Sequence, residues 1–267
     1  MKFGAYKKVA ALFEAELQRL GIFYSKNADG SYELVINAST KAKVTLDAAV
    51  HHWKQNPDPE IVVGYVQHVV GGAMFSNLDW EDAQKRLAFT LEQRESLKHP
   101  FLVELGPYIT PVTPELCLMY YCDLPEIESR RWVTPADLTD WKVSARDVIA
   151  VAGQHMNELM HQAKIEFVEM SGRRFAYLSL EQEWDKANLC MTSEFKRRIQ
   201  AEFTWPVRVA VPAINYMLIV PADQGDLFVH LAPSAIQEYR ESEDPLSLEI
   251  LELSDAGVRV VGKLNAL

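Results

Sequence analysis

The chain has 267 residues, 48% of them hydrophobic and 10% aromatic, and its formal net charge at pH 7 is −10. This apolar content excludes a disordered chain and is enough for the core of one large domain or two small ones. The acidic charge repels phosphate backbones and anionic lipids, so we expect no nucleic acid and no membrane as a partner. No stretch approaches the roughly 18 uncharged apolar residues of a membrane span.

Residues 1–98 are predicted to form a mostly helical region with a small β-hairpin. Apolar residues recur at helical spacing from Tyr6 to Leu20, and two glutamates interrupt the apolar stretch that a signal peptide needs. A hairpin is expected around Asn27–Gly30, where Asp-Gly suits a turn with positive φ. Further helices are expected up to Asn56, from Pro59 to Gly71–Gly72, and from Asp79 to about Lys98.

A second domain is predicted for residues 99–267, because His99–Pro100 and the stretch GPYITPVTPE mark a boundary. Beyond it, the apolar pattern favours strands, with hairpins around Ser171–Gly172 and Asp255–Gly257. Ser144 and Asp147 form a capping box that begins a long helix. We therefore expect an α+β fold, with the helical N-terminal third packed on a larger mixed, mainly antiparallel sheet with helices.

Cysteine usage indicates a reducing compartment. Cys117, Cys122 and Cys190 are odd in number and lie in apolar segments, whereas a secreted disulfide framework has paired cysteines in loops. Cys117 and Cys122 are five residues apart on a predicted strand, so their side chains point to opposite faces. We expect three core cysteines in a cytoplasmic protein.

The segment WPVRVAVPAINYMLIVP, residues 205–221, is the most regular part of the chain. Val207, Val209 and Val211 share one face of a predicted strand, and a solid apolar run follows the Pro-Ala-Ile-Asn break. Because Pro212 has no N–H, we expect strand pairing to end there. The segment predicts a buried hairpin, and a ligand loop at Asn215 is the alternative.

The order of several segments resembles the DUF1444 (YtpQ-like) family of uncharacterised bacterial proteins. The resemblance spans about Lys43 to Val261 and rests on KVTLDAAVHHWKQNPDPEIVVGYVQHVV, PELCLMYYCD, VTPADLTDWKVSARDVIAVAGQHMNEL, YLSLEQEWDKANLCM, the 205–221 segment and DPLSLEILELSDAG. It implies a cytoplasmic bacterial α+β protein and supplies no catalytic residue. The family has a polar or charged pair after Val-Pro, whereas here only Asn215 is polar in Ala213–Asn215.

The segment HMNELMH, residues 155–161, carries the pattern closest to that of an enzyme. Glu158 precedes His161 by three residues, which places two metal ligands on one helix face, and His155 lies a turn earlier. A di-iron site needs a second such pair, which is absent, as is the zincin spacing. We expect a solvated helix face without metal or cofactor; a metal-assisted hydrolase is the alternative.

Basic doublets are the other candidate binding feature. The candidate binding residues are Arg130, Arg131, Arg173, Arg174, Arg197 and Arg198, with Asp185 and Asn215. If folding brings the arginines together, they form a site for a phosphate or an acidic ligand. Otherwise they pair with glutamates or face solvent.

No assembled catalytic motif is present. The sequence lacks the nucleophile elbow, the phosphate-binding loop and the dinucleotide fingerprint. We therefore predict a non-catalytic, cytoplasmic binding or regulatory protein that presents a sheet face or groove to a protein partner. The metal-assisted hydrolase and the phosphate-binding or acidic-ligand module remain the alternatives.

Overall fold

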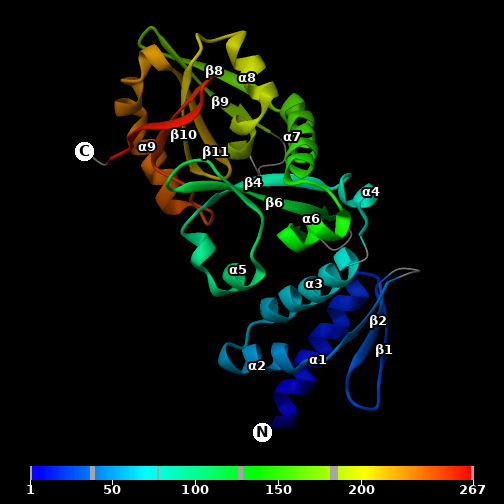
Figure 1. Cartoon of the computed structure of the whole chain (residues 1–267). Coiled ribbons are helices and arrows are strands. Elements are labelled where there is room, and N and C mark those ends of the chain that lie inside the picture. Colours follow the sequence, from blue (N-terminus) through cyan, green and yellow to red (C-terminus); the bar gives the residue numbers. More distant parts are fainter. Residues whose placement is uncertain (1, 37–39, 77, 126–128, 181–185, 266–267) are drawn as a thin grey trace. The chain divides into compact units, whose positions relative to one another are not determined.

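Figure 1 shows the computed structural model, which describes all residues except 1, 37–39, 77, 126–128, 181–185 and 266–267. The fold class is α+β, as predicted, with helices and three antiparallel sheets. The chain divides into two compact units, unit 1 with residues 1–86 and 122–131, and unit 2 with residues 87–121 and 132–267. Within the described residues, no helix has the length and apolarity needed to cross a bilayer.

Unit 1 combines helices with a three-stranded sheet in the order β1-β2-β3. Its elements are α1 (Lys2–Arg19), β1 (Phe23–Lys26), β2 (Tyr32–Val35), β3 (Lys41–Val44), α2 (Asp47–Gln55), α3 (Pro59–Ser76) and α4 (Trp80–Ala83). The predicted hairpin around Asn27–Gly30 is confirmed as β1 and β2. The predicted end of a helix at Gly71–Gly72 is wrong, because α3 continues to Ser76. Met74 packs on the unit 1 core, and this burial offsets the ~1 kcal/mol that a glycine costs inside a helix.

A second sheet is formed by β4 (Leu87–Gln93), β5 (Ile109–Pro111), β6 (Leu116–Leu124) and β7 (Ser129–Trp132), in the order β4-β6-β5 with β7 also on β6. The helix predicted from Asp79 to Lys98 is wrong. It ends at Ala83, and β4 follows, because Leu87, Phe89 and Leu91 are all buried at a spacing of two. The first division between the units falls after residue 86, and residues 122–131 are again part of unit 1.

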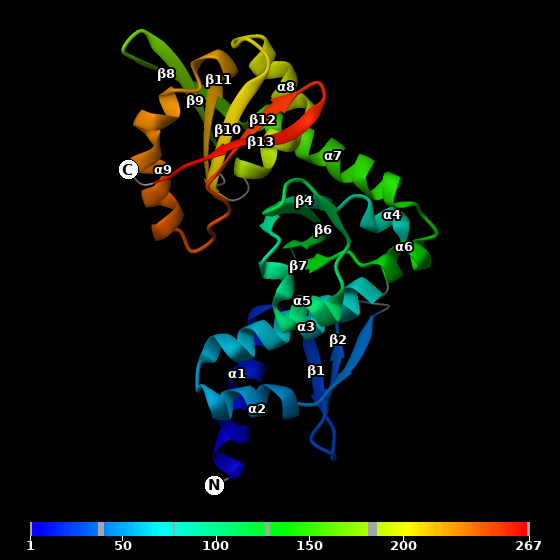
Figure 2. The same ribbon diagram turned by 60° about the vertical axis from the view of Figure 1, so that its left-hand side comes forward.

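Unit 2 also contains a six-stranded antiparallel sheet in the order β13-β12-β10-β11-β9-β8. Its strands are β8 (Lys164–Met170), β9 (Arg173–Ser179), β10 (Val207–Ala213), β11 (Tyr216–Pro221), β12 (Glu249–Ser254) and β13 (Gly257–Lys263). Helix α9 (Leu227–Glu241) covers the face that carries Ala210, Leu218 and Val220. Figures 1 and 2 show α7 (Ala145–Gln162) and α8 (Ser193–Gln200) on the other side of the sheet from α9.

The 205–221 segment forms the predicted buried hairpin at the centre of this sheet. Val207, Val209 and Val211 are fully buried, and Val207 pairs with Pro221. Pairing does not end at Pro212, contrary to our expectation. It shifts register between Ala210 and Ala213, and Ala213 then pairs with Tyr216. An irregular register lets the strand pass the missing N–H, since a bulge leaves one residue unpaired.

The other predicted hairpins of unit 2 are also confirmed. Strands β8 and β9 flank Ser171–Gly172, where both turn residues have positive φ, and β12 and β13 close the chain. The predicted capping box of Ser144 and Asp147 begins α7. All three cysteines are buried thiols, as expected.

Candidate functional site

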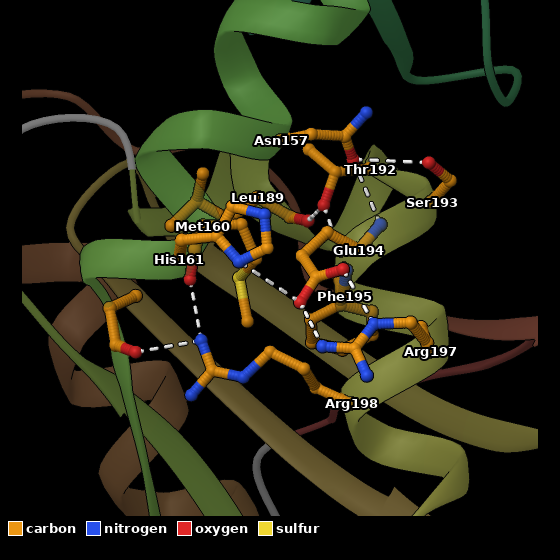
Figure 3. A network of polar contacts seen from close by, with 11 residues as sticks. Asn157, Met160, His161, Leu189, Thr192, Ser193, Glu194, Phe195, Arg197 and Arg198 are labelled. Carbon is orange, nitrogen blue, oxygen red and sulfur yellow. Dashed lines mark hydrogen bonds and ion pairs between the residues drawn. The ribbon is translucent and has the colours of Figure 1, made fainter.

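Five of the eleven candidate side chains lie on α7 and α8, which pack against each other in unit 2. Both helices bury an apolar stripe, with Met156 and Met160 on α7 and Phe195 and Ile199 on α8. The polar residues beside these stripes meet in the network drawn in Figure 3. The contact between α7 and α8 therefore brings several of the candidate residues together.

Asn157 of α7 ties the start of α8 to α7. Its side-chain oxygen accepts hydrogen bonds from the backbone N–H of Glu194 at 2.8 Å and from the hydroxyl of Ser193 at 3.1 Å. Thr192 is the N-cap of α8, and its hydroxyl oxygen accepts from the N–H of Phe195 at 3.1 Å. Two N–H groups that the helix itself cannot pair are thereby satisfied.

Glu194 is the anionic centre of the network, and its side chain is only 9% exposed. Arg197 donates from Nε to Oε2 at 2.7 Å and from Nη2 to Oε1 at 2.6 Å, and Nδ1 of His161 lies 3.3 Å from Oε1. The Arg197 guanidinium is the main cause that lowers the pKa of the Glu194 carboxyl. The carboxylate is therefore ionised and occupied by the Arg197 guanidinium, which suits an ion pair better than a general base.

Arg198 terminates α7. Its Nη1 donates to the carbonyl oxygens of Met160 at 2.5 Å and of Ala163 at 2.8 Å. The last carbonyls of a helix have no partner within the helix, and a cation placed there also opposes the negative end of the helix dipole. Figure 3 shows this side chain directed at the end of α7. These two hydrogen bonds give Arg198 a structural role at the end of α7.

The three candidate metal ligands, His155, Glu158 and His161, each contact a different group of the protein. Nδ1 of His155 donates to the carbonyl oxygen of Leu87 at 2.7 Å, Glu158 accepts from Gln154 at 3.4 Å, and His161 pairs with Glu194. Glu158 and His161 are exposed, as expected, but His155 is half-buried against β4. Among the described residues, no three His, Cys, Asp or Glu side chains are placed to hold a metal ion.

The remaining arginine candidates of unit 2 are also paired. Arg173 forms an ion pair with Asp226, and the guanidinium of Arg174 lies 4.8 Å from the ring centre of Phe167 and 3.9 Å from Glu202. Arg130 and Arg131 are counted with unit 1. Asp185 falls outside the described residues. The four arginines in unit 2 thus bind groups of the protein itself, and two of them, Arg174 and Arg197, pair with glutamates.

Three hollows in unit 2 were not predicted from the sequence, and all three involve α9. Asn215, an exposed residue of the β10–β11 turn, lines one of about 420 Å³ together with four carboxylates. A groove of about 460 Å³ runs along α9, and a hollow of about 610 Å³ lies near Tyr239 and Lys263. The walls of the last hollow come from segments far apart in the sequence, so local patterns carry no signal for it.

A comparison of this chain with models of known protein families, with curated proteins and with solved structures finds no match. The resemblance to the DUF1444 family stays a prediction.

Proposed function

We propose that this protein is a cytoplasmic, non-catalytic module that binds a short helical segment of a protein partner in the groove along α9. The observation that carries the proposal is the exposure of Val229, a residue that is 55% exposed beside an apolar floor. A large apolar side chain exposed in a groove favours binding, because a partner that covers it removes apolar surface from water. Three buried thiols support the cytoplasmic assignment.

The apolar floor follows one stripe of the helix. Val229, Ala232, Pro233 and Ile236 all line the groove, and their spacings of three and four residues place them on the same side of α9. From Val229 to Arg240 the groove is about 16 Å long, at a rise of ~1.5 Å per residue of α9. That length corresponds to three turns of a partner helix, whose apolar side chains pack into such a groove at matching intervals.

The rim of the groove adds a charge preference. Gln237 donates to Glu241 at 3.0 Å, so that these two side chains pair with each other. The guanidinium of Arg240, in contrast, has no hydrogen bond or ion pair within the part of the chain that the structure describes. An acidic residue near one end of the partner segment complements Arg240. We therefore expect an amphipathic segment with an apolar stripe and an acidic residue.

Selection from a peptide display library on the immobilised protein tests the proposal. We expect the selected peptides to carry apolar residues at helical spacing, and Val229→Asp to weaken their binding by about tenfold or more, because it places a charge in the apolar contact. The matched control is Val103→Asp, since Val103 is 65% exposed on α5 (Pro100–Leu105), outside the groove. Equal binding of the selected peptides to wild type and Val229→Asp contradicts the proposal.

A further inference from the structure

The hollow of about 610 Å³ in unit 2 is distinct from the α9 groove in its lining. It is bounded by the end of β4, the residues just before β6, the C-terminal half of α9 and the end of β13. The wall is held by hydrogen bonds between distant segments. Gln93 donates to the carbonyl of Pro245 at 2.7 Å, and the N–H of Arg94 donates to the carbonyl of Glu115 at 2.7 Å. The hollow is therefore part of the folded framework of unit 2.

Both carboxylates of the lining are already neutralised by a lysine. Nζ of Lys98 lies 2.6 Å from Oε2 of Glu95, and Nζ of Lys263 lies 2.5 Å from Oε1 of Glu115. The second oxygen of Glu115 accepts from the hydroxyl of Ser247 at 2.8 Å. These carboxylates and lysines therefore leave the hollow without a net charge of their own.

Arg94 supplies the charge that has no counterpart. Its guanidinium makes no hydrogen bond and no ion pair among the residues that the structure describes, although its backbone is fixed. The lining thus holds three cations and two anions, which leaves one positive charge. The hydroxyl of Tyr239, in the same lining, also lacks a hydrogen bond within the described chain. The guanidinium of Arg94 therefore offers a planar fork of N–H donors to a ligand, and the hydroxyl of Tyr239 offers one further donor.

We propose that this hollow binds a small organic carboxylate, with its oxygens on the guanidinium of Arg94 and the hydroxyl of Tyr239. The planar guanidinium matches a carboxylate with two parallel hydrogen bonds. The single unbalanced charge fits a monoanion better than a phosphate dianion, which would face Glu95 and Glu115 with a second negative charge. Leu246 and Pro114 give the lining an apolar part on which the carbon skeleton of the ligand rests.

Calorimetric titration with benzoate, acetate and inorganic phosphate tests this assignment on the full chain. We expect benzoate to bind with a Kd on the order of 1 mM, as for a small fragment, and more tightly than acetate because its ring buries apolar area. Arg94→Gln is expected to weaken benzoate binding by about tenfold or more, and Tyr239→Phe by several fold. The control Arg146→Gln, at an exposed arginine in the first turn of α7, leaves the affinity unchanged.

Three results would overturn the proposal: no benzoate binding to the wild-type protein, equal binding by Arg94→Gln, or phosphate binding more tightly than either carboxylate. Because the side chain of Arg94 is exposed and unpaired, its replacement leaves the fold intact, which circular dichroism verifies. Val229→Asp should still bind benzoate, so a failure of the α9 groove and a failure of this hollow are distinguishable.

Discussion

The backbone N–H of Leu91 donates a 2.6 Å hydrogen bond to the side-chain oxygen of Asn188, 97 residues further along the chain. Both residues are fully buried. Leu91 belongs to β4, and Asn188 belongs to the 3-10 helix η3 (Lys186–Met191), which also contacts β10 and β11. One buried amide therefore links the two sheets of unit 2.

Replacing Asn188 by alanine removes the acceptor and leaves a buried N–H unpaired. We expect Asn188→Ala to lower the free energy of unfolding by ~1–3 kcal/mol, the usual penalty for an unsatisfied buried polar group. Urea denaturation followed by tryptophan fluorescence measures this change. The control is Asn215→Ala in the exposed β10–β11 turn, which should change stability by less than ~0.5 kcal/mol. Equal effects of the two substitutions would contradict this role of Asn188.

Arg198 is predicted to stabilise the fold through the end of α7. Arg198→Ala removes both hydrogen bonds to the carbonyls of Met160 and Ala163, and hydrogen bonds to charged groups contribute ~1.5–3 kcal/mol each at most. We expect a clear loss of thermal stability. Arg197→Ala, one residue earlier, should cost less, because the Arg197 side chain itself is mostly exposed to solvent. A larger loss for Arg197→Ala would reverse this assignment.

The ion pair of Glu194 predicts a dependence of stability on pH. Arg197 beside Glu194 lowers the pKa of this carboxyl in the folded protein below its unfolded value. Its contribution to stability is therefore complete above the ordinary pKa of glutamic acid and is lost as the pH falls through and below that value. Glu194→Gln should lower stability at neutral pH and weaken the loss on acidification. Arg197→Ala, which removes the cause, should do the same.

The measurement is the unfolding free energy from urea titrations between neutral pH and about pH 3. An acid-side slope of Glu194→Gln that equals the wild-type slope would show that this carboxyl does not contribute.

Gly225 makes room for Arg208, which supplies the three heavy atoms nearest to a Cβ at this position. That Cβ would lie 1.9 Å from Nη1 and 2.9 Å from Cζ of Arg208. The backbone of Gly225 is helical, with φ −61°, so alanine introduces no backbone strain. Gly225→Ala should therefore destabilise by ~1–2 kcal/mol through overpacking. In an Arg208→Ala background it should be neutral or slightly stabilising, as for glycine replacement at an unstrained site.

This change of sign in the double-mutant cycle distinguishes steric conflict from a need for glycine itself. A constant penalty in both backgrounds would exclude the steric explanation.

Buried thiols should be unreactive in the folded protein. Burial raises the pKa of the Cys190 thiol to about 12 and that of Cys117 to about 11. Because the thiolate is the reactive form, we expect almost no reaction with Ellman's reagent at pH 8 until the protein is denatured. All three cysteines should then react. Rapid labelling of Cys117 or Cys190 in the native protein would contradict their burial.

Local sequence patterns predicted the hairpins and the helix starts well. The Asp-Gly and Ser-Gly turns and the capping box at Ser144 depend on backbone preferences within a few residues, so they hold in almost any tertiary setting. The segment from Asp79 to Lys98 was misread because Leu87 and Leu91 fit both a helical and a strand pattern. Tertiary contacts of β4 decided between them.

The sequence by itself determined the α+β class, the buried 205–221 hairpin and the core position of the cysteines, because each depends on apolar spacing within a short segment. The tertiary structure decided the partners of charged side chains, such as Glu194 for Arg197 and the α7 carbonyls for Arg198. It also decided where Arg94 and Arg240 stay unpaired beside a hollow. Such pairings depend on distances between residues that only the folded chain brings together. Ion pairs and hydrogen bonds form only at short distances, and the order of residues along the chain does not give these distances.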